Sequence, residues 1–251
     1  LTTNVLPGME MELHFSRENE WYRWFHEASV YFSEQSGGRY FTVPNFGNYA
    51  ADTLSLIRGS EQLMFDLVER PDWFRAQERM ITDVLLDAYE ERYRDVEKNP
   101  VEGYLNEAWM WAPKRAWGIH CDISSMVSTE MVKDLLWESQ HRIAELADYA
   151  YYHVDGPGVL RHLDLILQEE KIQAIQWLPG DGRNHPLQWL DVYRRIQEKG
   201  RSVQIFVPYD EVLPLLPEIR PGGVCLMVLG CPDETAAEAL IEAVERFYRG
   251  R

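Results

Sequence analysis

Short apolar runs alternate with helical segments through the second half of the chain, and this alternation constrains the fold most. The apolar runs are 116–122, 149–153, 174–178, 202–207 and 224–229. The segments with helical spacing that follow them are 129–147, 157–167, 186–199, 211–216 and 234–248. Continuous apolar runs are typical of strands buried on both faces. Strand–helix units with short links therefore predict a parallel sheet with right-handed crossovers.

The first 115 residues favour helix instead. Helical spacing covers 18–33 and 50–98, with Pro71 as a break or helix start, and 40–43 reads as a short strand. Six strands result, whereas a closed barrel needs eight. We predict an α/β fold, namely a (β/α)8 barrel of the TIM type whose N-terminal strands are missing or atypical. An open doubly wound sheet is the alternative. A first residue of Leu rather than Met leads us to expect a missing upstream segment.

The chain length and the absence of any Gly/Ser linker or repeat favour a single domain. We expect one barrel domain over 1–251, with a helix-rich part at 1–115 and regular βα units at 116–251.

Composition excludes several classes of partner. Twenty-five basic and 41 acidic residues give a net charge of −16, which disfavours nucleic acid and anionic membranes. The chain has no 18-residue apolar run and no signal-peptide pattern at its start. Its three cysteines form no disulfide framework, so we expect a cytoplasmic protein.

Chemically competent side chains gather where the predicted strands end. His153 and Asp155 are two residues apart, so on a strand they project to the same side. His120 and Asp122 end an earlier strand, and Cys231 follows the last one. Parallel α/β folds place their chemistry at the carboxyl ends of strands. We therefore name Asp155, His120 and Asp122 as candidate catalytic residues.

One imidazole nitrogen, one carboxylate oxygen and one thiolate are ligands that zinc accepts. His153, Asp155 and Cys231 would supply this set, with His120 and Cys121 as alternative ligands. In the alternative interpretation, His153 is a hydrogen-bonded histidine at a strand end, oriented by Asp155. Aromatic residues near the predicted loops could bind a substrate or pack against the sheet; they are Trp109, Trp111, Trp177 and Tyr209.

Several segments resemble the uroporphyrinogen decarboxylase superfamily, and within it the zinc- and corrinoid-dependent methyltransferases. They are 123–131, 151–158 and 175–182, together with Arg58-Gly59 and 66–71. The resemblance implies a (β/α)8 barrel with its active site at the mouth. It also implies a zinc site of the His-x-Cys type with a further cysteine in a late loop. His153 matches the histidine, Cys231 the late cysteine, and Asp155 replaces the first cysteine.

Three functions follow as hypotheses. The first is a metal-dependent methyltransferase that moves a methyl group between a small-molecule donor or acceptor and a thiol or a corrinoid held on a partner protein. The second is a catalytically altered barrel that acts as a ligand-binding protein. The third is a decarboxylase-type lyase that acts on an aromatic carboxylate and uses Asp122 or Asp155 as acid or base.

Overall fold

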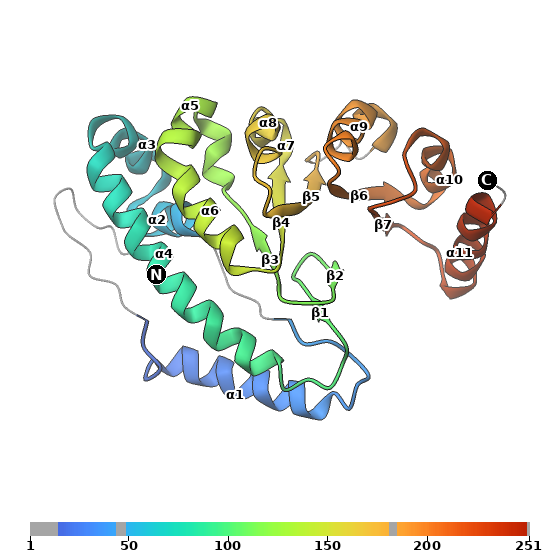
Figure 1. The fold of residues 1–251 in the computed structure, drawn as a ribbon, viewed down its shortest axis with the longest axis horizontal. Helices are drawn as coiled ribbons and strands as arrows, with labels where there is room; N and C mark the ends of the chain where they lie inside the picture. Colours follow the sequence, from blue (N-terminus) through green and yellow to red (C-terminus); the bar gives the residue numbers. More distant parts are fainter. Residues whose placement is uncertain (1–14, 44–48, 181–184, 250–251) are drawn as a thin grey trace. The chain divides into compact units, whose positions relative to one another are not determined.

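The computed structural model describes residues 15–43, 49–180 and 185–249, drawn in Figure 1. The chain forms two compact units, 1–151 and 152–251, and the boundary between them falls within strand β4. Among the described residues, no helix is both long enough and apolar enough to cross a membrane.

The first unit is mainly helical and ends with strand β3 and the start of β4. Its α-helices are α1 (Glu20–Gln35), α2 (Ala50–Arg58), α3 (Ser60–Glu69), α4 (Pro71–Val96), α5 (Thr129–Met131) and α6 (Trp137–Leu146). Its strands are β1 (Tyr104–Leu105), β2 (Trp111–Ala112) and β3 (Ala116–Ile119), followed by the 3-10 helix η1 (Asp122–Met126) and the π-helical segment η2 (Val132–Leu136).

The second unit continues the strand–helix alternation from β4 (Tyr149–Asp155) onward. Its other strands are β5 (Ile172–Leu178), β6 (Ser202–Pro208) and β7 (Val224–Leu229). Its α-helices are α7 (Gly156–Leu160), α8 (Leu163–Ile166), α9 (Leu190–Glu198), α10 (Val212–Leu215) and α11 (Glu234–Arg249). Its 3-10 helices are η3 (Pro186–Trp189), η4 (Tyr209–Glu211) and η5 (Leu216–Glu218).

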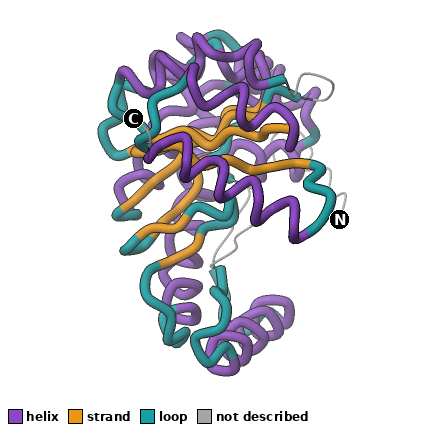
Figure 2. Tube along the Cα trace, turned by 90° about the vertical axis from the view of Figure 1, so that its right-hand side faces the viewer, coloured by secondary structure: helices purple, strands orange, loops and turns teal. Residues whose placement is uncertain are grey.

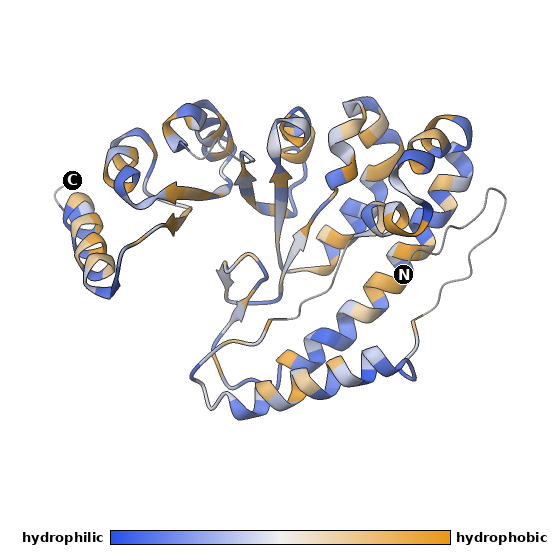
Figure 3. Ribbon diagram, turned by 180° about the vertical axis from the view of Figure 1, so that it is seen from behind, coloured by the Kyte–Doolittle hydropathy of each residue, from blue (hydrophilic) through white to orange (hydrophobic). Residues whose placement is uncertain are grey.

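Five strands form one sheet in the order β3-β4-β5-β6-β7, and β5, β6 and β7 pair in parallel. The strands of the second unit lie side by side in a twisted layer (Figure 2), and β6 and β7 are coloured mainly as hydrophobic (Figure 3). These features confirm the predicted α/β class. A doubly wound sheet reverses its strand order at a switch point, whereas this order contains no reversal. The described residues contribute five strands to the sheet, and a closed barrel needs eight.

The structure corrects the prediction for 40–43, which is not a strand; Thr42 Oγ1 instead lies 2.8 Å from Ser33 Oγ of helix α1. Other local signals are confirmed. Ser128 Oγ accepts from the backbone N–H of Met131 and so caps α5, and Pro71 occupies the first turn of α4.

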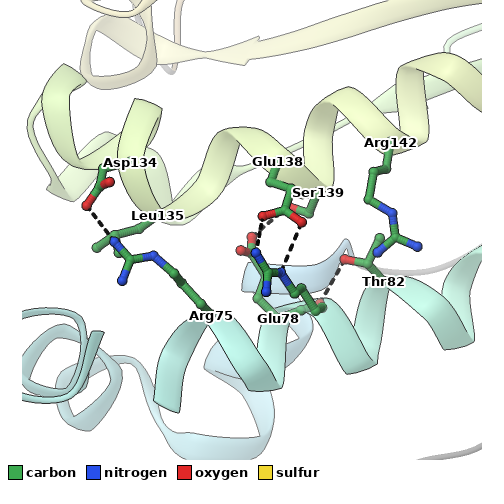
Figure 4. Close-up of a pocket in the computed structure, with 9 residues that line it drawn as sticks. Arg75, Glu78, Thr82, Asp134, Leu135, Glu138, Ser139 and Arg142 are labelled. Carbon is green, nitrogen blue, oxygen red and sulfur yellow. Dashed lines mark hydrogen bonds and ion pairs between the residues drawn. The ribbon is translucent and has the colours of Figure 1, made fainter. Parts of the chain in front are cut away.

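Helix α4 is joined to the segment 129–146 by matching rows of charge, which Figure 4 shows in part. Arg75 and Arg79 of α4 pair with Asp134 and Glu138, both at 2.7 Å. One turn further on the signs reverse, and Arg142 pairs with Asp83 at 2.6 Å. Exposed pairs of this kind contribute about 0–1 kcal/mol each. The four-residue spacing and the single reversal of sign mainly fix which turns of the two segments lie opposite one another.

A buried carboxyl group lies next to this charged surface. Glu78 is 3% exposed, and its Oε1 lies 2.7 Å from Ser139 Oγ, which is also 3.0 Å from the carbonyl of Leu136. A serine hydroxyl has one proton, so a protonated Glu78 allows both hydrogen bonds to form at once. Burial raises the pKa of Glu78 to about 8, against the opposing effect of the Ser139 hydrogen bond.

We predict that Glu78→Gln removes a pH dependence of stability. Between pH 4.5 and about 8 the folded protein keeps a proton on Glu78 that the unfolded chain releases, so the free energy of unfolding of the wild type falls as pH rises. This group contributes a slope of up to ~1.4 kcal/mol per pH unit. Urea denaturation from pH 5 to 9 measures it.

Glu138→Gln is the matched control, because the Arg79 hydrogen bond lowers the pKa of that exposed carboxyl group. The Glu138 variant should keep the decline, whereas the Glu78 variant should be flatter. Equal slopes for wild type and Glu78→Gln would contradict the assignment.

Candidate functional site

A carboxylate, two tyrosines and a histidine meet at the end of β3 in the first unit. We name Tyr49, Glu107, His120 and Tyr151 the Glu107 cluster. Tyr49 donates a hydrogen bond to Glu107 Oε1 at 3.0 Å, and Tyr151 and the backbone N–H of Gly118 also bond this carboxylate. Glu107 Oε1 also lies 3.9 Å from His120 Nε2. The side chains of Glu107 and His120 are 23% and 25% exposed, so both are partly accessible to solvent.

His120 is held on both sides within this cluster. Its ring stacks on Tyr49, with centroids 4.6 Å apart and planes 8° from parallel, and its Nε2 lies 3.2 Å from the Tyr151 hydroxyl. A proton can therefore pass between His120 and Glu107 through the Tyr151 hydroxyl. Burial raises the pKa of Glu107, although hydrogen bonds from Tyr49, Tyr151 and Gly118 limit the rise. A carboxyl group with a raised pKa is suited to acid–base chemistry near neutral pH.

The loop between β1 and β2 presents Glu107 to the cluster. Asn106 organises this loop, because its Oδ1 accepts from the backbone N–H groups of Ala108 and Met110. Trp109, at the tip, has a φ of 57° and is 61% exposed. The sequence marks the loop only through its tryptophans, so Glu107 could not be singled out from it.

Gly118 makes the cluster sterically possible. A Cβ at this position would lie 2.4 Å from Glu107 Oε1 and 2.4 Å from the Tyr151 hydroxyl. A glycine inside a strand often marks such a close approach, so Gly118 was the sequence signal that could have pointed to the neighbours of His120.

The residues that follow His120 have separate roles. The backbone N–H groups of Asp122 and Ile123 donate to the Asp52 carboxylate of α2 at 3.1 and 3.0 Å, which fixes the start of η1. The side chain of Asp122 is exposed. Cys121 is buried, and burial raises the pKa of its thiol well above the usual value, with Asp52 and Glu78 adding to the rise. A buried thiol of this kind is less reactive than an exposed one.

Within the second unit, His153 ends a row of hydrogen bonds that crosses the sheet. Its Nδ1 lies 2.5 Å from Gln176 Oε1 on β5. Gln176 Nε2 donates to Gln204 Oε1 on β6 at 2.6 Å, and Gln204 Nε2 donates to Cys225 Sγ on β7 at 3.7 Å. We name His153, Gln176, Gln204 and Cys225 the amide ladder. Because Gln176 presents its oxygen, Nδ1 of His153 carries the proton and Nε2 is the basic nitrogen.

The structure does not bring all the predicted zinc ligands together. Asp155 is exposed and lies two residues from His153 on β4, whereas Cys231 follows β7, with β5 and β6 between. Adjacent strands are about 4.8 Å apart, so roughly 14 Å separates β4 from β7. Cys231 Sγ instead lies 3.5 Å from the Asp233 carbonyl.

The aromatic candidates also occupy different environments. Trp177 is 1% exposed and packs against Trp189 with ring centroids 5.0 Å apart, so it is a core residue rather than a pocket wall. Trp111 is 55% exposed and donates through Nε1 to the Glu102 carbonyl. Tyr209 bonds the Ala236 carbonyl at 3.4 Å. Trp109 and Trp111, which flank the Glu107 loop, remain the candidates with an exposed surface to offer.

No protein-family model matches the chain, and no curated protein matches it in sequence. What the chain does must therefore be inferred from its own residues.

We predict that Gly118→Ala destabilises the first unit by about 1–3 kcal/mol, because the added methyl group overlaps Glu107 and Tyr151. Urea denaturation measures the change. Gly222→Ala is the control, since a Cβ there would meet no atom within 4 Å. The prediction fails if the two variants are equally stable.

Proposed function

We propose that this chain is a metal-dependent methyltransferase, similar to the uroporphyrinogen decarboxylase superfamily and built on a (β/α)8-type barrel. It would move a methyl group between a small molecule and a thiol or a corrinoid on a partner protein. The strand order without reversal supports a singly wound barrel. The free cysteines are in keeping with a cytoplasmic location.

The observation that carries the proposal is the orientation of His153. A histidine that binds a metal through one ring nitrogen usually donates the other N–H to a fixed partner. Gln176 Oε1 is such a partner for Nδ1, and Gln204 in turn fixes Gln176. Gln176 and Gln204 are 7% and 0% exposed, so the orientation of His153 is set by the core of the unit.

His153 Nε2 and the Asp155 carboxylate, both on β4, would supply two ligands. When bound, zinc would hold a substrate thiol as its thiolate, the form that attacks a methyl group.

Zinc content tests the proposal. After purification under reducing conditions from zinc-supplemented medium, we expect one zinc per wild-type chain and at least a tenfold loss in His153→Ala, measured by elemental analysis. Loss of one ligand and its fixed partner typically costs 10–100-fold in affinity or more. His141→Ala is the control, because His141 lies on α6 and pairs with Glu145 at 3.6 Å.

Further variants identify the remaining ligands. A catalytic zinc takes three protein ligands, and Asp155→Ala and Cys231→Ala each test one predicted ligand. A zinc-free wild type, or full zinc content in His153→Ala, would contradict the proposal.

A second candidate, a decarboxylase-type lyase, is favoured by the Glu107 cluster. Its carboxyl group, with a raised pKa, lies beside a histidine and could exchange a proton with a substrate carbon. This assigns the acid–base role to Glu107 and His120 rather than to Asp122 or Asp155.

For the lyase we predict that Glu107→Gln lowers the rate of carbon dioxide release from an aromatic carboxylate by about 10²–10⁴-fold, the usual contribution of a general acid or base. A chelator should leave that rate unchanged. Rate loss with the chelator, and none with Glu107→Gln, would contradict the assignment of Glu107 as the general acid or base.

A further inference from the structure

Helix α1 presents its aromatic residues to solvent. Trp21, Trp24, Tyr31 and Phe32 are 73%, 65%, 59% and 53% exposed, and Phe25 is 39% exposed. At about 100° per residue, these five side chains occupy one arc of roughly 120° centred on Ala28. Hydrophobic positions recur along the helix in Figure 3. Contiguous exposed apolar surface of this kind marks an interaction site.

The opposite side of α1, by contrast, is polar and contacts α4. His26 Nδ1 pairs with Asp95 at 2.7 Å, and Arg92 pairs with the same carboxylate at 3.0 Å and also bonds Ser29. Near the start of the helix, Tyr22 reaches Glu91. The amphipathic pattern is therefore the reverse of the usual one, in which the apolar face of a surface helix turns to the core. Buried polar contacts hold the helix and leave its aromatic face outward.

We propose that this face binds α1 of a second copy of the chain, with the two helices antiparallel and a twofold axis at Ala28. In that arrangement residue i lies opposite residue 56 − i. Trp24 then meets Phe32, Phe25 meets Tyr31, and the small Ala28 at the centre lets the helices approach. A face that complements itself is what a twofold-symmetric dimer needs.

Charge beside the face decides between possible occupants. Glu20, Glu27 and Glu34 lie on one side of the aromatic arc, about 80–120° from Ala28 around the helix. An anionic membrane is therefore a poorer occupant, because the chain also carries a net charge of −16.

The available area is sufficient. Aromatic side chains bury about 150–250 Å² each when fully covered, so five that are largely exposed offer roughly 600 Å² per chain. The pair would bury about 1,200 Å², which is at the lower limit of specific, stable interfaces.

Sedimentation velocity across a hundredfold range of concentration tests the proposal on the full chain. We expect a wild-type dimer, and a dissociation constant at least 100-fold larger for the double variant Trp24→Ser/Phe32→Ser. Phe65→Ser on α3 is the control, because Phe65 is 52% exposed outside this face and should leave the dimer unchanged.

A substitution at the twofold axis tests the pairing itself. Ala28→Glu should weaken the dimer at least tenfold, because it places two carboxylates where the helices approach most closely. Arg23→Glu, about 140° away around the helix, should leave the dimer unchanged. Circular dichroism checks that helix content is kept in each variant. A monomeric wild type, including one that binds neutral lipid vesicles, would overturn the proposal. So would a dimer that survives Trp24→Ser/Phe32→Ser or Ala28→Glu.

Discussion

A polar side chain within a strand that is buried on both faces must find its partner on the neighbouring strand. Gln176 and Gln204 obey this constraint, and the second unit is arranged around them. An unpaired buried amide would cost on the order of 1–3 kcal/mol, so each glutamine depends on the register of β5, β6 and β7. The same hydrogen bonds that satisfy the two amides decide which nitrogen of His153 is basic. The register of the strands therefore determines the protonation of the His153 ring in this unit.

The Glu107 cluster in the first unit follows a different logic. Its carboxylate is stabilised by tyrosine hydroxyls and a backbone N–H, and its approach to β3 depends on the missing side chain of Gly118. Tyr49 comes from the start of α2, Glu107 from the β1–β2 loop, and Tyr151 from β4. Three elements far apart in sequence thus converge on His120. The fold therefore holds the Glu107 carboxylate in place through neutral hydrogen-bond donors.

The sequence predicted the alternation after residue 116 well, because apolar strands and helical spacing are local signals. Strand β7 coincides with its predicted range, and the cap at Ser128 is where the pattern put it. The prediction of a strand at 40–43 was wrong, because β-branched and aromatic residues also suit an extended segment that packs on a helix. Glu107 could not be predicted as a site residue, because the sequence around it does not distinguish it from other acidic residues in loops. Gln176 and Gln204 were visible as polar residues in apolar strands, but their pairing needed the strand register.

Acidic groups lie close together around the end of β3 in the first unit and raise one another's pKa values. Asp52 caps η1 and also helps to raise the pKa values of Cys121 and Glu78. Burial alone would favour the neutral form of each of these groups, and their mutual repulsion acts in the same direction. A region where several acids are held close together, and are partly protonated as a result, is stabilised when a cation arrives and releases those protons. The acidic surroundings of His120 therefore weigh against the lyase, whose substrate is a carboxylate, and in favour of a cation at this end of β3.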